Sequence, residues 1–274
     1  DDALRLPFNQ ALRRVTPLSA LSDWQQASPG LVPTAFIQHA SRCGSTLIGQ
    51  MLACLETHIV ISEPPPLDSL LRSNLPAQQR DAAIKGLLSA YGQVRCGRET
   101  ALVIKLDAWN IVEFALLHGS FPDVPWLYLY RDPLEIAVSH LRQAGMHMVP
   151  GLLGAAHLDG TQPFVSREDD IARRLGLLLE AGLRHCTASG GLPVNYSELP
   201  QVMSGRLAGL FRLERAALDQ AFSATGRHAK SPSQAFVADG QAKQREASAL
   251  LRASIEQHAG AAYAGLEALR LSAR

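Results

Sequence analysis

Short, continuous apolar runs alternate with helical patterns along most of this chain, and this alternation constrains the fold more than any other feature. Each run is bounded by turn residues. Runs of this length and composition are typical of strands in a parallel sheet whose two faces are covered by helices. The runs that we expect to form strands are 34–40, 58–62, 101–107, 125–131 and 192–199.

Helical patterns occupy the stretches between these runs. The sequence therefore predicts an α/β three-layer fold, with a central parallel sheet flanked by helices and a helical C-terminal part. Right-handed crossovers would bring the carboxyl ends of the strands to one edge, where such sheets bind ligands. We expect helices from Ser45 to about Leu55, over 108–119, from Pro133, over 167–188, and through most of 201–274 apart from an interruption at 224–240.

Composition limits the classes of function. The 274 residues are 47% hydrophobic, which is enough for a full core, and the net charge of +1 gives no global attraction to nucleic acid or to an anionic membrane. The sequence has no apolar stretch near the ~18 residues of a membrane span and does not begin with a signal pattern. We therefore expect a cytoplasmic protein with a small-molecule partner, no nucleic-acid partner and no membrane span. The pattern leaves the oligomeric state open.

The four cysteines are scattered, with no CxxC pair and no histidine at metal-ligand spacing. We interpret them as free thiols in a reducing compartment and expect no metal site. Any anion-binding site must then be a local arrangement of loops and side chains.

The segment "SRCGST", residues 41–46, lies between the first apolar run and its helix. Against the phosphate-loop pattern G-x-x-x-x-G-K-[ST], His39 replaces the first glycine and Ser45 replaces the lysine, whereas Gly44 and Thr46 fit. A glycine here lets successive N–H groups turn toward an anion, and the following helix adds its positive N-terminus. The segment therefore has the backbone features of a phosphate loop without its lysine.

Arg42 supplies a positive charge two residues before Gly44, and its guanidinium can bind two anionic oxygens at once. Ser45 and Thr46 add hydroxyl donors. The alternative is a plain polar turn followed by a capped helix, and this segment alone does not decide between them.

A second candidate anion site follows the fourth apolar run. The strand would deliver Arg131 to its carboxyl end, Pro133 opens a helix, and Ser139 lies two helical turns along. Arg131 and Ser139 could then bind one anion together. The alternative is that Arg131 only pairs with Asp132 or with another carboxylate at the helix end.

Three motifs together resemble a known family. "SRCGST" resembles the 5′-phosphosulfate loop of the sulfotransferases that use PAPS (3′-phosphoadenosine 5′-phosphosulfate). "RDPLEIAVS" resembles their 3′-phosphate motif, and "PVNYSEL" resembles their later strand, with Ser197 and Glu198 at its acidic positions. The order and separation agree over roughly 34–200, and "SEPPPLDSLL", "VIKLDAW" and "FPDVPWLYLYRDP" are similar to a bacterial branch of the family. The family's late Arg-Lys-Gly string is absent from 226–236.

The resemblance implies a P-loop-like site for PAPS as co-substrate, with PAP as the product and no metal. The loop would hold the phosphosulfate, and Arg131 and Ser139 would hold the 3′-phosphate. The residues implied in binding are Arg42, Cys43, Gly44, Ser45, Thr46, Arg131, Ser139, Tyr196 and Lys230. The sequence shows no internal repeat, no low-complexity tract and no convincing linker, so we expect one domain, with an N-terminal extension at 1–32, a nucleotide-binding core at 33–200 and a mainly helical part at 201–274.

The chemistry requires a group that accepts a proton and groups that stabilise charge on the leaving oxygen. By the resemblance, Glu63 is the candidate base, Lys105 reaches the sulfate or bridging oxygen, and Arg42 neutralises the bridge as it breaks. Glu63 could instead only cap the next turn, and Lys105 could only pair with Asp107 or Glu63. A histidine is the other candidate base, and those considered are His39, His58, His140 and His147.

Asp107 and Asp132 suggest a magnesium site, but neither ends a strand after the right loop. The predicted function is transfer of a sulfuryl group from PAPS to a hydroxyl or amine of a small molecule, by in-line displacement. Two alternatives stay open: a P-loop phosphotransferase that uses ATP and magnesium, and a nucleotide-binding module without catalysis.

Overall fold

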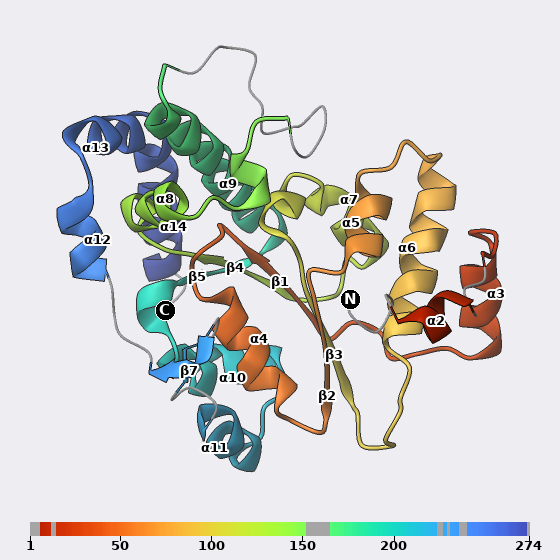
Figure 1. Ribbon diagram of the computed structural model, residues 1–274. Coiled ribbons are helices and arrows are strands. Elements are labelled where there is room, and N and C mark those ends of the chain that lie inside the picture. The colour runs from red at the N-terminus through yellow and green to blue at the C-terminus, as the bar shows by residue number, and fades with distance from the viewer. Residues whose placement is uncertain are drawn as a thin grey trace.

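The computed structural model describes residues 6–11, 15–151, 165–223, 227–228, 231–235 and 240–272. Its centre is a five-stranded, all-parallel sheet in the order β2-β3-β1-β4-β5 (Figure 1). Helices cover both faces, so the predicted α/β three-layer fold is confirmed. The strands are β1 Ala35–His39, β2 His58–Ser62, β3 Ala101–Lys105, β4 Trp126–Tyr130 and β5 Leu192–Asn195.

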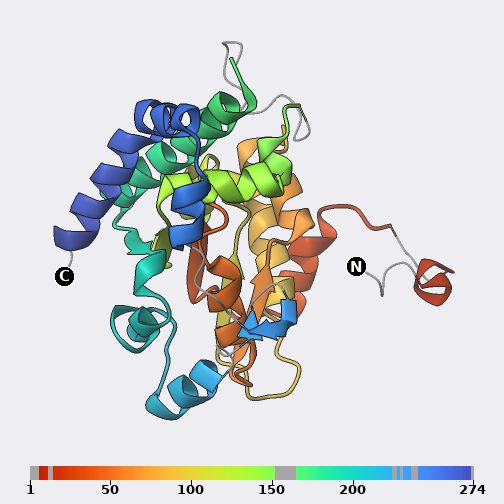
Figure 2. The same ribbon diagram turned by 60° about the vertical axis from the view of Figure 1, so that its left-hand side comes forward.

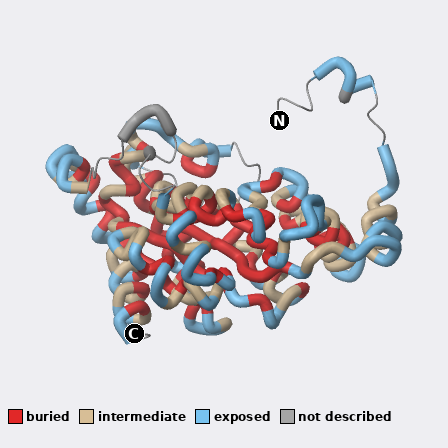
Figure 3. The backbone as a smooth tube through the Cα atoms, turned by 90° about the horizontal axis from the view of Figure 1, so that it is seen from below, coloured by how far each residue is buried: buried red, intermediate tan, exposed pale blue. Residues whose placement is uncertain are grey.

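The buried backbone of the sheet runs through the middle of the molecule, with exposed segments outside it (Figure 3). The helices are α2 Pro7–Ala11, α3 Ala20–Ala27, α4 Ser45–Ala53, α5 Pro65–Leu71, α6 Ala77–Tyr91, α7 Phe114–Ser120, α8 Pro133–Arg142, α9 Arg167–Ser189, α10 Arg206–Leu210, α11 Arg215–Ser223, α12 Gly240–Glu246, α13 Ala249–Ile255 and α14 Ala261–Ser272. Shorter helical turns are η1 Ala108–Ile111, η2 Met146–Met148, η3 Tyr196–Glu198, η4 Gln201–Ser204 and η6 Glu256–Gly260.

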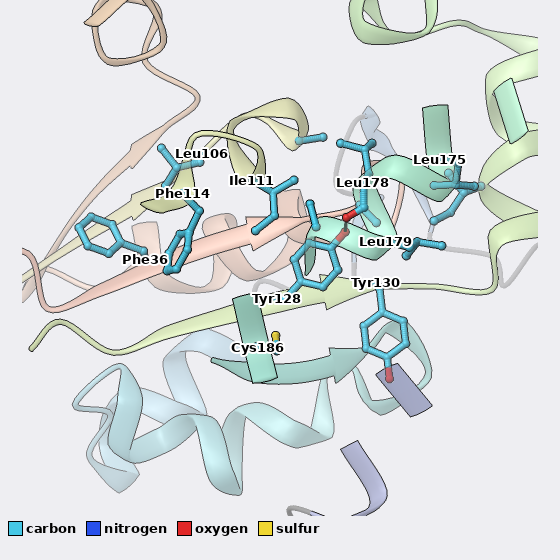
Figure 4. Close-up of a cluster of buried hydrophobic side chains, with 14 of the residues drawn as sticks. Phe36, Leu106, Ile111, Phe114, Tyr128, Tyr130, Leu175, Leu178, Leu179 and Cys186 are labelled. Carbon is cyan, nitrogen blue, oxygen red and sulfur yellow. Dashed lines mark hydrogen bonds between the residues drawn. The ribbon is translucent and has the colours of Figure 1, made fainter. Parts of the chain in front are cut away.

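Successive residues of each central strand face opposite layers, because side chains alternate across a strand. Phe36, Tyr128 and Tyr130 pack into the layer that contains α5 to α9, α13 and α14 (Figure 4). Ile37 and Leu129 pack against α4, α10 and α11. Both layers are apolar, which explains why the strands read as continuous hydrophobic runs.

The C-terminal helix α14 is tied to the carboxyl ends of β4 and β5. Oε1 of Glu267 accepts hydrogen bonds from the Tyr130 hydroxyl (2.5 Å) and from Nδ2 of Asn195 (2.9 Å). Arg270 donates to the same carboxylate from the next turn of the helix. The last described helix thereby helps to fix the edge of the sheet where the strands end.

Two features differ from the sequence-based expectations. The predicted helix over 108–119 is divided into η1 and α7. The interruption at 224–240 contains a small antiparallel pair, β6 Arg227–His228 and β7 Ser231–Ala235, which apolar periodicity missed because its residues are mostly polar. Helix α2 lies apart from the rest of the described chain (Figure 2). Among the described residues, no helix is both long and apolar enough to span a bilayer.

Candidate functional site

The direction of the strand order changes between β1 and β4. After β1 the chain crosses to β2 at one edge of the sheet, and after β4 it crosses to β5 at the opposite edge. The connections thus leave adjacent strands in opposite directions, which is where open parallel sheets bind ligands. The loop 40–44 and Arg131 both follow strands at this point.

The loop after β1 has an unusual backbone conformation. Ser41, Arg42 and Gly44 have positive φ angles of 69°, 48° and 91°. Within the described part of the chain, no group accepts a hydrogen bond from the N–H of Arg42, Gly44 or Thr46. The helix α4 begins at Ser45, so these donors lie at its positive end. The arrangement is a ready binding site for an anion.

Gly44 is required by space as well as by its positive φ. A Cβ atom at this position would lie 2.8 Å from Cδ1 of Leu199 and 2.9 Å from Cδ2 of Tyr196. The η3 turn after β5 therefore packs directly on the loop. This contact brings Tyr196, a predicted binding residue, to the loop.

The loop side chains have different environments. Nη2 of Arg42 donates to the carbonyl of Gln143 (2.8 Å), just after α8. The Cys43 thiol is buried and donates to the Leu129 carbonyl (3.2 Å), and burial raises its pKa to about 12 against an opposing effect of Lys105 and Arg131. Cys43 can therefore contribute to binding only through its backbone. Ser45 is buried, whereas Thr46 is partly exposed.

Arg131 lies next to the loop and contacts both Glu135 and Tyr196. Nε donates to Oε2 of Glu135 (2.5 Å), and the guanidinium carbon lies 4.3 Å from the centre of the Tyr196 ring. Tyr196 thus contacts both Gly44 and Arg131. Ser139 lies on α8, as Glu135 does, and its hydroxyl donates to the carbonyl of Glu135 (2.8 Å). The hydroxyl must therefore rotate before it can bind an anion.

Glu63 and Lys105, two of the three predicted catalytic residues, form an ion pair. Nζ of Lys105 donates to Oε1 of Glu63, and the Lys105 side chain is 3% exposed against 44% for Glu63. Nε2 of His39 lies 3.4 Å from the same oxygen. These neighbours, His39 and Lys105, hold the pKa of Glu63 at about 2. Glu63 is therefore a carboxylate at neutral pH, and a weak base.

The backbone around Glu63 is also unusual. Its φ is 49°, and its N–H donates to the Lys105 carbonyl (2.7 Å). Nδ1 of His39 accepts a hydrogen bond from the Ser41 N–H (3.0 Å). In the neutral ring the proton is therefore on Nε2, the nitrogen that faces Glu63. Burial lowers the pKa of His39, which favours that neutral form. His39 therefore connects the loop to the Glu63–Lys105 pair.

The other histidines that were considered as bases have structural contacts. Nε2 of His58 bonds with the Phe211 carbonyl (2.8 Å), and Nδ1 of His140 accepts from the Gly145 N–H (3.2 Å). His147 lies between the rings of His140 and Trp109, and burial lowers its pKa to about 3.

Asp107 is the residue whose importance the sequence did not indicate. It follows β3 at the same edge as Glu63, and burial, with the charges of Glu63 and Asp68, raises its pKa to about 7. A possible signal is an aspartate two residues after a lysine in an apolar strand, a pattern that suggests a metal ligand or a partner for Lys105 rather than a base.

The structure thus brings together most of the predicted residues at one edge of the sheet. Those whose positions it describes are Arg42, Cys43, Gly44, Ser45, Thr46, Glu63, Lys105, Arg131, Ser139 and Tyr196. Lys230 lies outside the described residues. Within the described part, no group of three or more His, Cys, Asp or Glu side chains could hold a metal ion. No protein-family model matches this chain, and no curated protein matches it either.

Proposed function

We propose that this protein is a sulfotransferase that transfers a sulfuryl group from PAPS to a hydroxyl or amine of a small molecule. The observation that carries the proposal is the contact of one ring, Tyr196, with both Gly44 and Arg131. It joins a buried guanidinium to a loop whose N–H donors at Arg42, Gly44 and Thr46 have no acceptor within the described part of the chain. A nucleotide that carries a phosphosulfate at one end and a 3′-phosphate at the other needs two such anion sites, held at a fixed separation.

Each part of the site has a role in this reaction. The N–H groups of the loop and the helix α4 would bind the phosphosulfate, with Arg42 beside them. Lys105 would stabilise charge on the bridging oxygen as the S–O bond breaks. Arg131 would bind the 3′-phosphate, together with Ser139 once its hydroxyl rotates. The acceptor hydroxyl must lose a proton, and two carboxylates at this edge, Glu63 and Asp107, could accept it.

The absence of a lysine at position 45 supports PAPS over ATP. In phosphate loops that bind ATP with magnesium, a lysine reaches the β- and γ-phosphates and a hydroxyl binds the metal. Here Ser45 occupies that position and is buried. A cytoplasmic location is part of the proposal, because all four cysteines are free thiols.

Ligand-dependent melting tests the proposal. PAP and adenosine 5′-monophosphate differ only in the 3′-phosphate, so they form a matched pair. At about 100 times its dissociation constant, PAP should add about 2.7 kcal/mol to the free energy of unfolding, which is roughly 5–10 °C in Tm for a chain of this size. Adenosine 5′-monophosphate at the same concentration should give a much smaller shift.

Arg131→Gln should remove the difference between PAP and adenosine 5′-monophosphate. Arg215→Gln, at an exposed position in α11, is the control and should keep it. Release of PAP from PAPS in the presence of an acceptor then distinguishes an enzyme from a binding module. A larger shift with ATP and magnesium than with PAP would contradict the proposal and favour a phosphotransferase.

A further inference from the structure

We propose, on the basis of the sulfotransferase function above, that Asp107 rather than Glu63 accepts the proton of the acceptor, and that Glu63 positions Lys105. The sequence pointed to Glu63 for the first role. The ion pair of Glu63 with Lys105 and the position of Asp107 beside that pair favour the opposite assignment.

Glu63 is already engaged. Its Oε1 atom accepts a hydrogen bond from Nζ of Lys105 and lies 3.4 Å from Nε2 of His39. Accepting a further proton would break the pair and leave the ammonium group of Lys105 buried without a counter-charge. This geometry suits a residue that orients Lys105, and it does not suit a general base.

Asp107 lies beside these groups on the same side of the sheet. Ile37 pairs with Lys105, and continuing that register by two residues places Asp107 level with His39. The ladder continues past the strand, because the Leu106 N–H donates to the Ile37 carbonyl (3.0 Å). The backbone of Asp107 is extended (φ −70°, ψ 152°), and its side chain forms a capping box with Asn110 at the start of η1, so the carboxylate is held where β3 ends.

The turn that follows holds Asp107 in this position. Its N–H donates to Oδ1 of Asn110 (3.1 Å) at the start of η1. Oδ1 of Asp68 in turn accepts from Nδ2 of Asn110 and from Nε1 of Trp109, both at 2.7 Å. The base would therefore be supported by a network that is anchored on a second element, α5.

The charges that act on Asp107 come from three elements. Glu63 after β2 and Asp68 on α5 disfavour its ionisation, as burial does, whereas Lys105 on β3 and Arg72 at the end of α5 favour it. The balance raises the pKa of Asp107 to about 7. A base is most effective when its pKa lies near the working pH.

In the proposed step, the O–H bond of the acceptor breaks and its proton moves to the Asp107 carboxylate. A new bond forms between that oxygen and sulfur while the bond from sulfur to the 5′-phosphate oxygen breaks. The leaving PAP takes the electron pair, next to Arg42 and Lys105. Asp107 then returns its proton to water.

Rates as a function of pH test the assignment. PAP release from PAPS is measured with water and with 2-naphthol as acceptors. The wild-type kcat should rise through about pH 7. Asp107→Asn should lower kcat by about 100-fold or more without raising KM for PAPS, and Asp107→Glu should restore part of it. Asp123→Asn, at an exposed position before β4, is the control and should change neither value.

Glu63→Gln should lower the rate but keep a rise with pH, displaced to lower pH because one negative charge beside Asp107 is gone. If Asp107→Asn retains the wild-type rate, or if Glu63→Gln alone abolishes the rise, the assignment is wrong.

A titration that needs no acceptor separates this inference from the proposed function. With ¹³C-labelled aspartate, the carboxyl signal of Asp107 is identified by its loss in Asp107→Asn. In the PAP complex it should titrate near pH 7, and Glu63→Gln should shift it to lower pH. Titration below about pH 5 in that complex would overturn the inference and leave the function standing, whereas failure to bind PAP would overturn the function.

Discussion

The ammonium group of Lys105 lies in an apolar strand, with Glu63 as its partner. Glu63→Gln should lower the free energy of unfolding by about 2–3 kcal/mol at pH 7. That is less than for a fully buried pair, because the Glu63 side chain is 44% exposed and solvent screens it. The Glu63 pKa lies at about 2, below its usual value, so the stabilisation is complete above about pH 4.5 and is lost as the pH falls toward 2.

Urea unfolding from pH 7 to pH 3 measures this effect, and Lys105→Met provides the matched background. In the Lys105→Met protein there is no buried charge to compensate, so Glu63→Gln should cost little. An equal cost in both backgrounds would show that the pair is not the cause.

The effect of Asp107 on the free energy of unfolding should depend on pH in the opposite sense to that of Glu63. The Asp107 carboxyl has a raised pKa of about 7, so the fold prefers the protonated form, and ionisation of Asp107 destabilises the protein as the pH rises from about 4 to above 7. Asp107→Asn should therefore be more stable than the wild type at pH 8, by roughly 1–2 kcal/mol after allowance for solvent screening, and equal to it at pH 4. Thermal unfolding at the two pH values checks this, and a variant less stable at pH 8 would contradict it.

At the scale of elements, the turn between β1 and α4 depends on Gly44. Gly44→Ala would place a Cβ atom against Leu199 and Tyr196 at a φ of 91°. We expect a loss of about 1–3 kcal/mol in stability, together with loss of the Tm shift caused by PAP. Gly119→Ala is the control. Gly119 lies near the end of α7, where an added Cβ atom would have no neighbouring atom within 4 Å. The Gly119→Ala protein should therefore be as stable as the wild type or up to about 1 kcal/mol more stable.

The sequence predicted the helices and strands whose apolar residues follow directly from which of their faces are buried. All five strands and the helix after the loop were found, because strands buried on both faces must be apolar along their whole length. It could not predict β6 and β7, which are mostly polar, or the division of 108–119. The η1 turn is bound by Asp68, which lies about forty residues earlier in the chain and accepts hydrogen bonds from Trp109 and Asn110.

The site was predictable where a local motif carried it and not where distant side chains meet. The loop 41–46 and Arg131 follow directly from motif and strand end. The sequence offers the pairing of Glu63 with Lys105 only as one of several alternatives, because this pairing depends on which strands become neighbours. The environment of Asp107 comes from β2, β3 and α5 together, so no local pattern could indicate it.

At the scale of the whole molecule, α14 stabilises the far edge of the sheet through Glu267. The Tyr130 hydroxyl and Glu267 form a charge-assisted hydrogen bond between the core and the last helix. Tyr130→Phe and Glu267→Gln should each lower stability, and the double variant should show a coupling energy of about 1 kcal/mol. Denaturant unfolding of the four proteins measures it. Tyr91→Phe, on α6, is the control and should show no coupling with Glu267→Gln.

Cys43 belongs to the loop after β1, and its thiol is buried on the inner side, where it donates to the Leu129 carbonyl of β4. A thiol-alkylating reagent can reach it only while the loop is lifted, whereas the exposed Cys96 reacts at once and serves as an internal reference. The rate of alkylation at Cys43, relative to that at Cys96, therefore reports how often this loop opens. Mass spectrometry of the labelled peptides measures both rates. A molecule that binds to the loop should slow labelling at Cys43 and leave the rate at Cys96 unchanged.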